Sequence, residues 1–205
     1  MYEPDAITSR VVEQFLYNQL LSSHAALDIA LDELTNNPEL ARQAGQALVR
    51  ASTLYKDWFA IAPTPKNFSS HRGAGIYEWL KSHNRPFYRT RKLPHLIGDE
   101  AQQLHVLSSL EAYLPTKFQH WEISTRSRPN RFIISLGPIE IDSPMYILAK
   151  KTAPVSYMLK NLNRDIIASF IILRNARLAG ISIRSGKTAK LHCSLTLVSQ
   201  LKLNL

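Results

Sequence analysis

The stretch LHCSLTLVSQLKLNL, residues 191–205, alternates apolar and polar side chains over most of its length. Six leucines and Cys193 fall on one parity, which Ser199 interrupts, whereas polar residues from His192 to Asn204 dominate the other. Successive side chains of a β-strand point to opposite faces of the sheet. The stretch therefore predicts a strand with one buried face and one face in solvent.

The same two-residue period occurs earlier in the chain. Ile181 and Ile183 predict a strand that reaches residues 191–205 across a turn at 185–187. Residues 121–136 alternate around a turn at 127–130 and predict a hairpin, after which residues 139–141 could add a third short strand.

Residues 154–178 are apolar nearly all round between 166 and 173, which predicts one long helix at the centre of the core. Residues 118–205 therefore predict an α+β fold of the form ββ(β)–α–ββ. In this fold an antiparallel sheet is covered on one face by the long apolar helix. A mixed segment with two shorter helices precedes the sheet.

The first third of the chain predicts a helical hairpin. Apolar residues recur at helical spacing before and after Asn36-Asn37-Pro38, where Asn37 is placed to cap a second helix that begins at Pro38. Pro63 and Pro65 end this region. We therefore expect an acidic helical hairpin over residues 1–62 and a basic α+β domain over residues 63–205.

Charge separates these two regions. Residues 1–65 hold four basic and eight acidic side chains, a net charge of −4, whereas residues 66–205 hold twenty-one basic and eight acidic, a net charge of +13. Such an uneven distribution predicts a polyanionic partner for the basic part. The acidic hairpin, with its apolar stripes, could bind a protein partner.

Few motifs for chemistry are present. The single cysteine, Cys193, excludes an internal disulfide and a structural zinc site, which favours a reducing, cytoplasmic location. No apolar run reaches the roughly 18 residues of a membrane span. The turn Ser185-Gly186-Lys187-Thr188 resembles the end of a phosphate-binding loop, but Ile181 stands where that motif needs glycine. We expect no metal, cofactor or membrane.

Two basic clusters are candidates for nucleic-acid binding. Segment 66–92 interleaves cations, which displace counterions from phosphates, with aromatic rings, which stack on unpaired bases. Three arginines surround the turn at 127–130. The candidate residues are Lys66, Arg72, Lys81, Arg85, Phe87, Tyr88, Arg89, Arg91, Lys92, Arg126, Arg128 and Arg131.

The polar face of the C-terminal strand, with His192, Thr196, Gln200 and Lys202, is a further possible RNA platform. A face that is merely in solvent or forms a dimer is the simpler interpretation.

The leading hypothesis is a non-catalytic nucleic-acid-binding module of a larger assembly. RNA is slightly favoured over DNA because the aromatic residues of segment 66–92 suit unpaired bases and no helix-turn-helix pattern fits, and single-stranded DNA remains a possible partner. One alternative is an adaptor whose positive charge meets an acidic protein. Another is a metal-independent ribonuclease that uses His71, His83 or His95.

Overall fold

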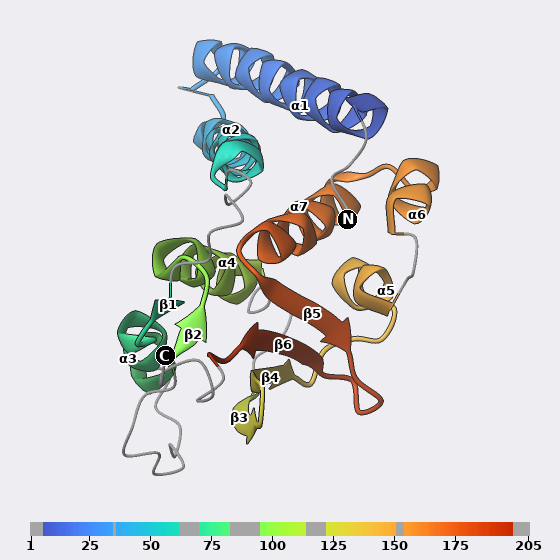
Figure 1. Cartoon of the computed structure of the whole chain (residues 1–205). Coiled ribbons are helices and arrows are strands. Elements are labelled where there is room, and N and C mark those ends of the chain that lie inside the picture. Colours follow the sequence, from blue (N-terminus) through green and yellow to red (C-terminus); the bar gives the residue numbers. More distant parts are fainter. Residues whose placement is uncertain are drawn as a thin grey trace. The chain divides into compact units, whose positions relative to one another are not determined.

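The computed structural model describes residues 6–34, 36–61, 70–82, 95–113, 122–150 and 154–198 (Figure 1). The chain divides into two compact units, Met1–Ala60 and Ile61–Leu205, and each has a hydrophobic cluster of its own. The predicted α+β class with an N-terminal helical hairpin is confirmed.

The first unit consists of two packed helices, α1 (Ala6–Asp32) and α2 (Pro38–Phe59). As predicted, the side chain of Asn37 accepts a hydrogen bond from an amide in the first turn of α2, and proline begins this helix. The indole of Trp58 on α2 donates to a carboxylate oxygen of Glu13 on α1 at 3.2 Å. This bond links the first half of α1 to the last turn of α2.

The second unit contains a four-stranded antiparallel sheet with strand order β3-β4-β6-β5. The strands are β3 (Glu122–Arg128), β4 (Arg131–Gly137), β5 (Ile181–Ser185) and β6 (Leu191–Thr196). Both predicted hairpins are present, with turns at 129–130 and 186–190. Residues 199–205 of the alternating stretch lie outside the described residues.

Helices and one short strand pair complete this unit. Two-residue strands β1 (Ser70–His71) and β2 (Leu96–Ile97) pair with each other. The helices are α3 (Ala74–Ser82), α4 (Glu100–Tyr113), α5 (Pro144–Lys150), α6 (Pro154–Lys160) and α7 (Arg164–Leu178). Asp99 caps α4 by accepting a hydrogen bond from the Gln102 amide. No helix in the described ranges is long and apolar enough to cross a bilayer.

The expected long helix over residues 154–178 is instead two helices, α6 and α7. The side chain of Asn163 accepts a hydrogen bond from the Ile166 amide at 3.0 Å and so caps α7. The side chain of Asn161 donates to the Tyr157 carbonyl at 2.9 Å. Asparagine side chains that bond to nearby backbone compete with helix continuation, and these two end one helix and start the next.

The possible third strand at residues 139–141 is also corrected. Ile139 is buried and its amide donates to the Ala189 carbonyl at 2.8 Å, but Ile141 lies in a turn and is 66% exposed. The turn leads into α5, a helix that the sequence analysis did not predict. The alternation of two isoleucines over three residues was too short to distinguish a strand from a turn.

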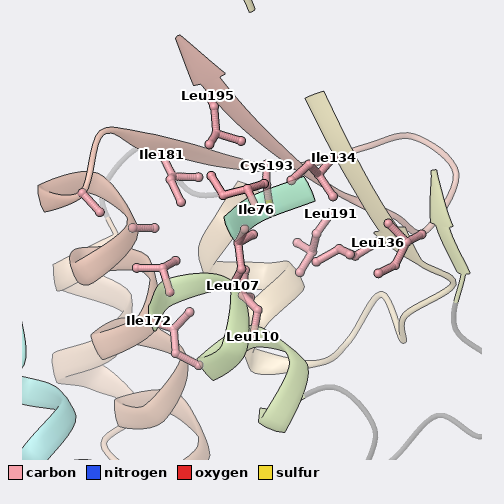
Figure 2. Packing of buried hydrophobic residues seen from close by; sticks show 14 of the residues in the cluster. Ile76, Leu107, Leu110, Ile134, Leu136, Ile172, Ile181, Leu191, Cys193 and Leu195 are labelled. Atoms are coloured by element: carbon pink, nitrogen blue, oxygen red, sulfur yellow. The ribbon is translucent and has the colours of Figure 1, made fainter. Parts of the chain in front are cut away.

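One face of the sheet carries the core of the second unit. Figure 2 shows residues of the strands pointing toward residues of the helices: Ile134, Leu136, Ile181, Leu191, Cys193 and Leu195 on one side, and Ile76, Leu107, Leu110 and Ile172 on the other. Burial of Cys193 raises the pKa of its thiol to about 12, so the reactive thiolate is scarce at neutral pH, as its parity predicted. The alternate residues of these four strands therefore point away from the core.

Candidate nucleic-acid interface

Three successive rows of outward residues cross the strands, because directly paired residues of an antiparallel sheet lie on the same face. The row nearest the β3–β4 turn holds Arg128, Arg131 and Thr196. The middle row holds Arg126, Ile133, Ser194 and Ser182, and the last holds Ser124, Ser135, His192 and Arg184. We call these eleven residues the basic sheet face.

Positive charge on the basic sheet face is accessible. Arg126, Arg128, Arg131 and Arg184 are all exposed. Within the described part of the chain, none of these four side chains forms an ion pair with a carboxylate. Glu122 is the only acidic residue in the four strands; it begins β3 and has the same parity as Ser124 and Arg126, one row beyond the eleven residues. Among the described residues, no salt bridge has to break before this face binds an anion.

Like charges face each other at one end of the basic sheet face. Arg128 and Arg131 are direct cross-strand partners at the β3–β4 turn. Like charges directly opposite each other destabilise a strand pair. An anionic group between two guanidinium groups removes that repulsion and accepts charge-assisted hydrogen bonds from both. This pair is therefore a candidate position for a bound anion such as phosphate.

The spacing of the rows suits a repeating anion. Outward residues recur every second position, at about 6.6–6.8 Å along a strand, and neighbouring strands lie about 4.8 Å apart. The distance along a strand is close to the separation of successive phosphates in a nucleic-acid strand. Serine and threonine hydroxyls between the arginines supply further donors to phosphate oxygens. Apart from the imidazole of His192, this face has no aromatic ring, so it supports phosphate contact rather than base stacking.

Two separate sequence-based candidates meet on this face. Arg126, Arg128 and Arg131 came from the turn cluster, whereas His192 and Thr196 came from the polar face of the last strand. Arg184 was not among the site residues predicted from the sequence. The inward parity of Ile181 and Ile183 could have indicated its direction. The strand patterns alone could not predict that β4 lies beside β6.

Segment 66–92 is described only in part. Arg72 is exposed, and the exposed ammonium of Lys81 lies 3.6 Å from a carboxylate oxygen of Glu78 one turn earlier in α3. The indole of Trp79 donates to Glu111 at 2.8 Å while its ring packs against the core. Outside the described residues lie Lys66, Arg85, Phe87, Tyr88, Arg89, Arg91 and Lys92, together with Gln200 and Lys202.

Among the three candidate histidines, His71 is held by the fold. Its Nε2 lies 3.0 Å from Oε1 of the buried Gln103, and its Nδ1 accepts a hydrogen bond from the Gly73 amide at 3.0 Å. The Gln103 amide group also donates to the Ile97 and Ala179 carbonyls. Both ring nitrogens of His71 are thus engaged, which supports a structural role.

The other two histidines add little to a catalytic interpretation. His95 is exposed, and His83 lies outside the described ranges. Where side chains are described, no three His, Cys, Asp or Glu residues are grouped so that they could hold a metal ion.

Comparisons with known proteins give little further information. No family model matches the chain, and no curated protein matches it. Among solved structures, the chain is similar to one described as a bacterial phosphotransferase, with 12% sequence identity and a TM-score of 0.42. The match covers 95% of this chain and 98% of that one. A likeness this distant carries no argument about function.

Proposed function

We propose that this chain is a non-catalytic module that binds the phosphate backbone of nucleic acid through the basic sheet face. One observation carries the proposal: four exposed arginines from three strands lie on one sheet face, and none is paired with a carboxylate in the described part of the chain. Lysine and arginine side chains that neutralise phosphates release counterions, and this release supplies most non-specific affinity.

RNA remains the favoured nucleic acid, on sequence grounds. The aromatic residues of segment 66–92 would stack on unpaired bases, while the sheet face would contact phosphates. The sheet face itself has donors for the backbone of RNA or single-stranded DNA and, apart from the imidazole of His192, no ring on which a base could stack. In this proposal, contact with unpaired bases depends on segment 66–92, and phosphate contact depends on the sheet.

Membership of a larger assembly is supported by the first unit. Several apolar side chains of α1 and α2 are largely exposed, among them Ile7 at 73%, Ile29 at 63% and Val49 at 66%. Exposed apolar side chains in an acidic helical pair favour a protein partner. The unpaired, buried thiol of Cys193 supports a reducing, cytoplasmic location.

A salt titration tests the proposed function. The affinity for a fluorescent oligouridylate should fall as salt is added. The logarithm of the association constant should decrease linearly with the logarithm of the salt concentration, with a slope of about −0.7 for each phosphate neutralised on a single strand. Four arginines predict a slope of about −3. Fluorescence anisotropy between about 50 and 200 mM salt measures this slope.

Absence of binding to oligouridylate and to single-stranded DNA at about 50 mM salt would reject the proposal. Under the same conditions, an acidic polypeptide such as polyglutamate serves as the competing ligand. Tight binding of polyglutamate without oligonucleotide binding would favour the adaptor hypothesis, because only that hypothesis needs an acidic protein partner.

A further inference from the structure

The row farthest from the arginine pair combines three different polar side chains. Ser135 on β4, His192 on β6 and Arg184 on β5 occupy successive strands in register. The serine and histidine side chains are half-buried, whereas the guanidinium group is exposed. Cross-strand partners have Cβ atoms about 4.5–5.5 Å apart, so Arg184 can reach a group that is bound above His192.

The imidazole of His192 is held on two sides. Its Nδ1 lies 2.8 Å from the Ser135 hydroxyl oxygen. The backbone of Gly186 lies so close to the ring that a Cβ at this position would collide with the ring atoms. The Tyr146 hydroxyl in turn donates to the Gly186 carbonyl at 2.6 Å and fixes that turn. The ring is consequently oriented before any ligand binds.

The direction of the Ser135–His192 hydrogen bond depends on the tautomer of the imidazole. In one direction the hydroxyl donates to Nδ1, and its proton is then unavailable to a ligand. In the other, Nδ1–H donates to the hydroxyl oxygen, and the hydroxyl proton is free to point outward. A phosphate oxygen is an acceptor, so a bound phosphate selects the second direction.

We propose that Ser135, His192 and Arg184 form a phosphate-binding subsite, in which the serine hydroxyl and the arginine guanidinium donate to one phosphate group. The inference rests on the proposed function and deepens it by assigning a specific phosphate position on the basic sheet face. His192 and Thr196 are four residues apart on β6, which places this subsite about 13 Å from the row of Arg128 and Arg131. A strand of a few nucleotides can therefore contact both ends of the face.

The experiment observes the imidazole of His192 directly. Long-range ¹H–¹⁵N NMR spectra report which ring nitrogen carries the proton. Uridine 5′-monophosphate, inorganic phosphate and the dinucleotide UpU are titrated separately at constant ionic strength, with uridine as the uncharged control. UpU carries only a phosphodiester, so the comparison separates a backbone phosphate from a terminal one. We expect saturable shifts at His192 with all three phosphate ligands, a gain of Nδ1–H, and no change with uridine.

Variants separate this subsite from general positive charge. Arg184→Gln should weaken phosphate binding by about tenfold, because one charge-assisted donor is lost. Ser135→Ala should remove the tautomer change, and Gly186→Ala should reduce binding by displacing the His192 ring. Lys160→Gln also removes one positive charge, but at an exposed position on α6. It should leave phosphate binding unchanged.

The outcomes distinguish the subsite from the proposed function. No shift at His192 with any phosphate ligand, while oligouridylate still binds, would overturn the subsite and leave the proposed function standing. Equal weakening by Lys160→Gln and Arg184→Gln would also overturn it. Shifts with uridine monophosphate in a protein that binds no oligonucleotide would support the subsite and reject nucleic acid as its source of phosphate.

Discussion

Replacement of Arg126, Arg128 and Arg131 by glutamate should weaken oligouridylate binding at least about a hundredfold at about 50 mM salt. Three phosphate contacts are lost, and each hydrogen bond to a charged group contributes about 1.5–3 kcal/mol. The three introduced carboxylates also repel the phosphates. Anisotropy titrations of the variant and the original chain give the ratio of the two dissociation constants.

This change should leave folding nearly intact, since all three side chains are exposed and the reversal replaces one like-charge pair across β3 and β4 by another. The matched control is Arg10→Glu, Arg50→Glu and Lys160→Glu, which changes the net charge equally at exposed positions outside the sheet. The control should retain most of the affinity. Equal losses in the two variants would mean that net charge, and not the sheet face, governs binding.

Replacement of Leu107 by alanine should lower the free energy of unfolding by about 2–5 kcal/mol. Leu107 lies on α4, is 0% exposed and packs in the cluster between helices and sheet (Figure 2). Its truncation removes apolar contacts and leaves a cavity that the surroundings fill only in part. Urea denaturation followed by circular dichroism measures the change.

Leu162→Ala is the control for this experiment, because Leu162 is 41% exposed between α6 and α7. Its cost should stay near the roughly 0.5 kcal/mol of surface changes. If Leu107→Ala costs no more than the control, Leu107 does not pack in the core between α4 and the sheet.

Much of the fold could be predicted from residue periodicity, and the reasons are local. The parity of Leu191, Cys193 and Leu195 alone determines which face of β6 is buried, and Asn37-Pro38 alone starts α2. The break between α6 and α7 was missed because the apolar pattern continues through it. There the asparagine side chains end and restart the helix by hydrogen bonds that hydrophobic periodicity does not record.

The candidate site required long-range information. Charge counts identified Arg126, Arg128 and Arg131 as a cluster, but Arg184 joins them only because β6 pairs with both β4 and β5. Ser135 and His192 are 57 residues apart in the chain, and their contact follows from that register. Strand periodicity gives the face on which a residue lies and leaves its neighbours on that face undetermined.

Titration of ¹⁵N-labelled protein with oligouridylate tests the central claim most directly, because each backbone amide reports its own surroundings. We predict that the largest shifts map to β3, β4, β5 and β6, centred on Arg126, Arg131, Arg184 and His192, with small changes in α1 and α2. Shifts that avoid these strands, or spectra that stay unchanged at saturating oligonucleotide, would contradict the assignment of this face as the nucleic-acid interface.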